Sequence, residues 1–161
     1  MSDFLRFSRN IRRHGSNIEN NSVVLTKRVA KTALRSLVNG TPVDKGVARS
    51  NWRVSLGNVT RSVIPAYSPG KKLGIDEGAN AKAAISAGIA IINRLKVGAI
   101  RRGTGQAGQA LYITNSIPYL GKLRSGHSSQ QGADWVAAAL QEAASEISQV
   151  RLLSSRMRDD D

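Results

Sequence analysis

Apolar residues recur with the spacing of an α-helix in three stretches of this chain. The first stretch is defined by four residues placed every four positions, which are Leu25, Val29, Ala33 and Leu37. A polar cap is expected among residues 20–22, and Gly40 followed by Pro42 is expected to end the helix. Helical spacing returns over residues 79–96 and 132–154. The pattern therefore predicts a long N-terminal helix, a middle helix and a C-terminal helix.

Between these helices the pattern changes to the alternation that is typical of β-strands. One alternating set consists of Trp52, Val54 and Leu56, with polar residues between them. Residues 110–116 alternate in the same way, and a turn at residues 57–58 is expected to lead into another strand over residues 59–65. This order of elements predicts an α+β fold, in which a small, mainly antiparallel sheet packs against the long N-terminal helix, the middle helix and the C-terminal helix.

Length and composition indicate one domain with short extensions. The chain has 161 residues, and aromatic residues make up only 4% of it, so Ala, Val, Ile and Leu must form most of the core. We assign Trp52 and Trp135 to that core. We predict a basic flexible arm over residues 1–15, a single α+β domain over residues 16–154 and a charged tail over residues 155–161.

Several classes of protein are excluded or disfavoured by the sequence. The chain has no cysteine, which excludes disulfides, thiolate metal sites and a cysteine nucleophile. Its first residues lack the apolar run of a signal peptide. No stretch approaches the roughly 20 apolar residues that a membrane-spanning helix needs. We therefore expect a soluble, non-secreted protein with no membrane contact.

The charge of the chain is strongly positive, at +13 from 24 basic and 11 acidic residues. The predicted arm carries Arg6, Arg9, Arg12 and Arg13. Such a balance attracts nucleic acid or acidic protein surfaces, although a generally solvated basic surface is an equal alternative. Aromatic residues do not interleave with the basic ones, and no DNA-reading motif is present. Any DNA contact is therefore expected to involve the phosphate backbone and to be non-specific.

Two stretches have a superficial likeness to catalytic or cofactor sites. His127 stands beside Ser128 and Ser129, but the only other histidine is His14, and no G-x-S-x-G motif is present. The segment at residues 103–108, GTGQAG, precedes a predicted strand rather than a helix, so it does not fit a dinucleotide-binding loop. We predict no catalytic residue, no metal site and no cofactor.

Two segments together resemble the signatures of one protein family. They are TPVDKGVARSNWRVSLG at residues 41–57 and YITNSIPYLGKLRSGHSSQ at residues 112–130. They are similar to segments of tailed-phage neck, head–tail joining and tail-completion proteins, which include the lambda Z-like minor tail proteins. The matching positions are Thr41, Pro42, Val43, Asp44, Gly46, Arg49, Asn51 and Trp52, then Asn115, Pro118, Tyr119, Leu123, Gly126, Ser128 and Gln130. The chain departs from the family at Lys45 and in lacking a proline shortly after Gln130.

The resemblance implies a structural protein of a bacteriophage virion, with no enzymatic activity. It implies assembly in the host cytoplasm into a homo-oligomeric ring, six-fold or twelve-fold, around the DNA channel of the neck. The implied partners are head-completion or connector proteins and tail-terminator or tail-tube proteins, with non-specific contact to packaged DNA. The candidate subunit-interface residues are Pro42, Asp44, Arg49, Trp52, Tyr119, Leu120, Leu123, His127 and Gln130, of which Arg49 could pair with Asp44.

Two alternatives remain open from the sequence. The same candidate residues could pack within one subunit instead of joining two subunits. The chain could also be a basic, non-sequence-specific DNA-binding protein that acts alone, which its net charge of +13 favours.

Overall fold

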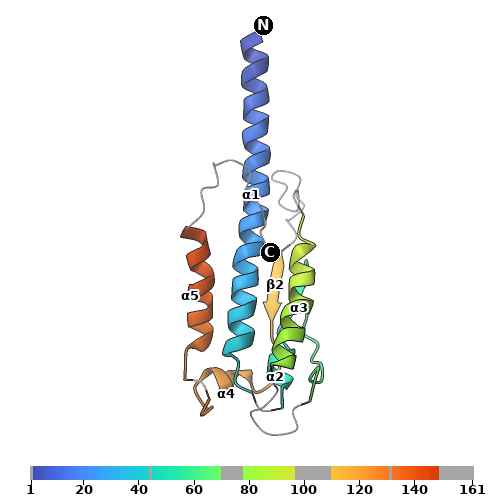
Figure 1. Ribbon diagram of the computed structural model, residues 1–161, viewed down its shortest axis with the longest axis vertical. Coiled ribbons are helices and arrows are strands. Elements are labelled where there is room, and N and C mark those ends of the chain that lie inside the picture. Colours follow the sequence, from blue (N-terminus) through green and yellow to red (C-terminus); the bar gives the residue numbers. More distant parts are fainter. Residues whose placement is uncertain (1, 44, 70–77, 97–109, 131, 149–161) are drawn as a thin grey trace.

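One helix, α1 (Ser2–Gly40), runs along most of the molecule, and the other elements pack around the half that holds its C-terminal end (Figure 1). The computed structural model describes residues 2–43, 45–69, 78–96, 110–130 and 132–148. On one side of α1 lies α5 (Trp135–Ser148), and on the other lie α3 (Ala79–Asn93) and the sheet. Two short helices, α2 (Val47–Ser50) and α4 (Leu120–Arg124), close the end away from the N-terminus.

The sheet consists of two antiparallel strands, β1 (Arg53–Leu56) and β2 (Leu111–Thr114). Their register pairs Arg53 with Thr114 and Leu56 with Leu111. The predicted α+β class is confirmed, as are both of these strands and the middle helix. The strand predicted at residues 59–65 is wrong. There, the side chain of Asn51 accepts a bond from Ile64 N at 2.8 Å and donates one to Ile64 O at 2.7 Å, in place of a strand ladder.

The N-terminal helix begins much earlier than its predicted cap at residues 20–22. It already includes Ser2, so the predicted basic arm is the first part of α1 and shares one continuous helix with the domain. Two causes can be identified. Apolar residues at Phe4, Phe7 and Ile11 extend the helical spacing toward the N-terminus. Ser22 does not act as a cap, because its Oγ donates a hydrogen bond to Ile18 O at 2.8 Å inside the helix.

The core lies between α1, α3 and α5 and is formed mainly by aliphatic side chains. Its most deeply buried members are Leu34, Val38, Ala84 and Ile92. Trp52 and Trp135 are also buried there, as predicted. Because Ala84 and other small residues line α3, the helices can approach one another closely.

The buried face of α5 differs from the face predicted from its apolar spacing. The prediction placed Val136, Leu140, Ala143, Ile147 and Val150 on the inner side. The structure instead buries Trp135, Ala139 and Ala143, and leaves Leu140 and Ile147 each 55% exposed. On the inner side Ser36 and Thr32 of α1 donate hydrogen bonds to Glu142 and Glu146. Small side chains and polar hydrogen bonds therefore orient α5. The last residue of the predicted face, Val150, lies outside the described residues.

Gly88 marks the closest approach of α3 to its neighbours. A Cβ atom at this position would collide with Leu34 Cδ2 and would lie 2.9 Å from Val54 Cγ2. Leu34 is fully buried, so its side chain cannot turn out toward solvent to make room. The glycine thus permits α1, α3 and β1 to meet at one point.

Replacing Gly88 with alanine is expected to destabilise the protein. Alanine would favour a helix by roughly 0.5–1 kcal/mol, but overpacking a core costs about 1–3 kcal/mol. We expect Gly88→Ala to lower the free energy of unfolding by about 1–2 kcal/mol in denaturant titrations. Gly121→Ala is the matched control, because a Cβ there meets no atom within 4 Å. Equal stability of the two variants would contradict the close approach.

Candidate functional site

The two segments that carry the family resemblance meet at the end of the molecule that holds α2 and α4 (Figure 1). The first segment supplies the loop after α1, helix α2 and strand β1, and the second supplies β2 and α4. Strand pairing joins them, and Asn115 Nδ2 donates a hydrogen bond to Ala48 O at 2.8 Å. We refer to the site formed by residues 41–52 and 115–130 as the junction.

Gln130 holds the first segment with both atoms of its side-chain amide. Val43 N donates to Gln130 Oε1 at 2.8 Å, and Gln130 Nε2 donates to Val43 O at 2.6 Å. Val43 is buried, so without Gln130 its backbone N–H and C=O would lack these hydrogen-bond partners in a site with little access to water. The loop that contains His127 is therefore attached to the same subunit through Gln130.

Thr41 connects the end of α1 to the centre of the junction. Its hydroxyl accepts a hydrogen bond from Trp52 Nε1 at 2.7 Å and donates one to Leu37 O at 2.6 Å. Its carbonyl accepts a bond from Arg49 Nε at 3.1 Å. The predicted partner of Arg49, Asp44, lies outside the described residues. Arg49 thus helps to shape the loop within its own subunit.

The indole of Trp52 also links the junction to α5. Its ring meets that of Trp135 edge to face, with centroids 6.2 Å apart and planes at 88°. Such aromatic pairs contribute about 0.5–1.5 kcal/mol beyond their burial. One buried pair therefore fixes the C-terminal helix relative to the first signature segment.

Asn80 is a central residue of this region that sequence reasoning did not identify. It is fully buried, and its Oδ1 accepts hydrogen bonds from Ser50 Oγ and Ser68 N, each at 2.8 Å. Its Nδ2 donates to Ser68 O at 2.6 Å. The signal was one asparagine in the first turn of an alanine-rich helix, where such a residue is usually assigned to capping and not to a buried hydrogen-bond network. Gly46 has φ +80° and touches this amide, which leaves no space for a side chain there.

The structure separates the interface candidates by their exposure. Pro42 and Trp52 are buried, and Leu120 packs against the core. Arg49 and Leu123 are half-buried. The exposed members are Tyr119, His127 and Gln130. Among the candidates that the structure describes, which leave out Asp44, only these last three present much surface to another molecule, although Gln130 also makes the amide contacts with Val43.

A hollow of about 280 Å³ lies between the two segments. Its lining residues are Pro42, Val43, Lys45, Ala48, Tyr119, Leu123, His127, Ser128, Ser129 and Gln130. The walls combine apolar side chains with a lysine amine and an imidazole. The size and lining suit the side chain of a bound protein segment better than a buried cofactor. In the part of the chain that the structure describes, no group of three or more histidines and carboxylates could hold a metal ion.

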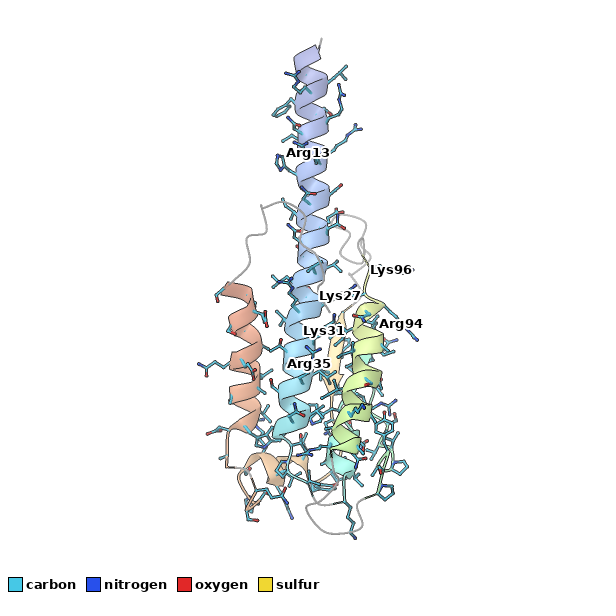
Figure 2. All side chains as sticks on the ribbon, in the orientation of Figure 1. Arg13, Lys27, Lys31, Arg35, Arg94 and Lys96 are labelled. Atoms are coloured by element: carbon cyan, nitrogen blue, oxygen red, sulfur yellow. The ribbon has the colours of Figure 1, made fainter. Side chains whose placement is uncertain are left out.

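Several basic residues lie along α1 and at the adjacent end of α3 (Figure 2). Lys27, Lys31 and Arg35 follow one another along α1 below Arg13, and Arg94 and Lys96 lie beside them at the end of α3. The predicted arm residues Arg6, Arg9, Arg12 and Arg13 are all exposed. With 3.6 residues per turn, Arg6, Arg9 and Arg13 fall on the same side of the helix as Lys27 and Lys31.

Comparison with protein-family models, with curated proteins and with solved structures finds no match to this chain. A search of the described residues for a helix long and apolar enough to cross a membrane also finds none.

Removing the side-chain amide of Gln130 is expected to loosen the junction. Gln130→Ala leaves the Val43 N–H and C=O without their partners, so we expect the free energy of unfolding to fall by about 1–2 kcal/mol. Hydrogen exchange at the Val43 amide should become about tenfold faster. Ser129→Ala is the control, since Ser129 lines the same hollow and is exposed. Unchanged exchange at Val43 would show that Gln130 does not hold this loop.

Proposed function

We propose that this protein is a structural subunit of a tailed-phage virion, which forms a ring in the neck and takes part in tail completion or head–tail joining. The proposal is carried by one observation: the two segments that resemble this family are the two segments that Gln130 and Asn115 fasten together. Most residues shared with the family act within this junction, which accounts for their occurrence as a set. The ring would surround the DNA channel and would have no catalytic role.

Exposed apolar residues on two flanks of the domain support ring assembly. On α5, Leu140 and Ile147 are each 55% exposed. The segment after β1, which runs beside α3, exposes Val59, Val63 and Tyr67 by 45–49%. A closed ring needs two different surfaces that bind each other head to tail, and α5 and α3 lie on opposite sides of α1. These two flanks are therefore suitable contact surfaces between neighbouring copies.

Charged substitutions on the outer side of α5 are expected to prevent ring formation. Leu140→Glu together with Ile147→Glu should weaken association at least tenfold, because carboxylates would be buried in an apolar contact. Light scattering and electron microscopy of the purified protein measure the change. The matched control is Gln141→Glu with Ser148→Glu, which adds the same charge to exposed positions of the same helix.

Two outcomes would contradict the proposal at different levels. Rings that survive the Leu140→Glu and Ile147→Glu substitutions would exclude α5 as the contact between neighbours. A protein that forms no ring, and that is absent from the necks of purified particles when these are imaged, would exclude the neck function itself.

A second candidate function is supported by the basic side of α1. Arg6, Arg9 and Arg13 share that side, so they could contact DNA phosphates in an isolated subunit. For such a protein we expect micromolar affinity at physiological salt and a steep loss of affinity with salt. Changing the three arginines to glutamine should reduce the slope of log K against log salt by about 2–3. Salt-insensitive or absent DNA binding would exclude this function.

A further inference from the structure

The hollow at the junction has an apolar base and a polar rim. We use the word base for its buried and half-buried apolar residues, which are Pro42, Val43, Ala48 and Leu123. We use the word rim for its exposed residues, which are Lys45, Tyr119, His127, Ser129 and Gln130. Binding sites between proteins have the same layout, because an apolar centre supplies most of the binding energy and a polar border surrounds it.

The polar groups of the hollow are mainly hydrogen-bond donors. In the part of the chain that the structure describes, neither the amine of Lys45 nor the imidazole of His127 has a hydrogen-bond or ion-pair partner. An amine only donates, and an imidazole donates an N–H whether it is neutral or charged. The hydroxyl of Ser128 accepts a hydrogen bond from Gln130 N at 3.2 Å, so its own proton can be donated to a ligand. These donors favour an occupant that is rich in acceptors.

The charge around the hollow is positive. Helix α4 carries Lys122 and Arg124 in exposed positions, and the rim adds Lys45. Among the residues of the junction that the structure describes, which leave out Asp44, none is acidic. A negatively charged partner would therefore be attracted to this end of the molecule, and a positively charged one would be repelled.

The hollow is already formed in the single subunit. Its two walls come from the two segments of the junction, and the side-chain amide of Gln130 joins them through its bonds of 2.8 and 2.6 Å with Val43. A further bond of 2.8 Å joins Asn115 Nδ2 to Ala48 O. Because the walls are held in place, little ordering of the protein is needed when an occupant binds.

The size of the hollow restricts what it can hold. Its volume of about 280 Å³ is close to the lower limit of small-molecule pockets, which span roughly 300–1,000 Å³. It can therefore hold one side chain, while the groups next to that side chain lie at the rim. We propose that the hollow binds an acidic segment of a partner protein, with one apolar side chain of that segment against the base and its carboxylates beside Lys45 and His127.

A protein segment fits this site better than nucleic acid does. Phosphate groups could contact the cations of the rim, but the apolar base forms no favourable contact with a phosphate or a sugar. Interfaces with DNA are also more polar and more uniformly basic than this site. The remaining alternative is a single-stranded base stacked on Tyr119, which an oligonucleotide can test directly.

The hollow and the proposed ring contacts lie on different surfaces. The ring contacts were assigned to the flanks of the domain, whereas the hollow lies at the end that holds α2 and α4 (Figure 1). One subunit could therefore bind its neighbours and an acidic segment at the same time. The inference does not rest on the proposed function, because a single subunit contains the whole site.

Fluorescence anisotropy of a labelled peptide measures the binding. The probe is a short peptide with one leucine between aspartates, and it is added to the full-length protein at physiological salt. We expect this peptide to bind at least tenfold more tightly than one with asparagines in place of the aspartates. Replacing the leucine with glycine should also weaken binding about tenfold, because the base of the hollow would remain empty.

Two pairs of variants separate the hollow from the general positive charge of the protein. Lys45→Glu should raise the dissociation constant at least tenfold. Lys122→Glu is its matched control, since it makes the same change of charge at an exposed residue that does not line the hollow, and it should have at most about a threefold effect. Ser129→Trp should fill the hollow and prevent binding, whereas Ser125→Trp, at an exposed position outside the lining, should not.

Nuclear magnetic resonance locates the bound peptide. The backbone amide signals of Ala48, Leu123 and His127 should shift on titration with the aspartate peptide. Those of Arg6 and Arg9, at the other end of α1, should not. Since Lys45, Lys122, Ser125 and Ser129 are all exposed, their variants should keep the melting temperature of the wild type.

Several results would overturn the inference. These are equal binding of the aspartate and asparagine peptides, equal effects of Lys45→Glu and Lys122→Glu, or unchanged binding to Ser129→Trp. A single-stranded oligonucleotide that binds more tightly than the peptide and displaces it would assign the hollow to nucleic acid. Rings that form without peptide binding would overturn this inference alone, whereas peptide binding by a protein that never forms rings would support it and count against the ring proposal.

Discussion

The buried hydrogen bond between Trp52 and Thr41 is the contact on which the arrangement of this protein depends most. It lies where α1 ends and β1 begins, and the same threonine oxygen donates to the last turns of α1. Trp52 then meets Trp135 at the start of α5. Three parts of the chain, α1, β1 and α5, are thus fixed relative to one another around one hydroxyl. Since that hydroxyl is almost completely buried, leaving the indole N–H without it would cost about 1–3 kcal/mol.

The sequence predicted helices and strands correctly where their apolar spacing could be explained in only one way. The alternation around Val54 and the helical spacing after residue 79 gave the correct elements, because both elements pack apolar side chains against the core. The prediction of a strand at residues 59–65 was wrong for a different reason. Asn51, a distant side chain, satisfies the backbone of Ile64, and no local pattern reveals such a partner.

The orientation of α5 shows a second limit of sequence patterns. Large apolar residues such as Leu140 and Ile147 were expected inside, yet alanines occupy the contact with α1. Close helix packing favours small side chains, whereas hydrophobic spacing alone favours large ones. The candidate site was predicted in the same partial way. Its two segments lie together in the structure, but the amide contacts of Gln130 and the role of Asn80 could be found only from the three-dimensional structure.

The length of α1 has a mechanical consequence for any assembly that contains this protein. Among the described side chains of α1, the first buried one is that of Asn21, so the helix before it forms a rod of about 30 Å. A tilt of only 10° at its base would move its tip by about 5 Å, nearly one helical turn. Conversely, a contact that holds the tip restrains the tilt of the body tightly. The protruding helix can therefore act as a lever, through which a small rearrangement at one end sets the orientation of the other.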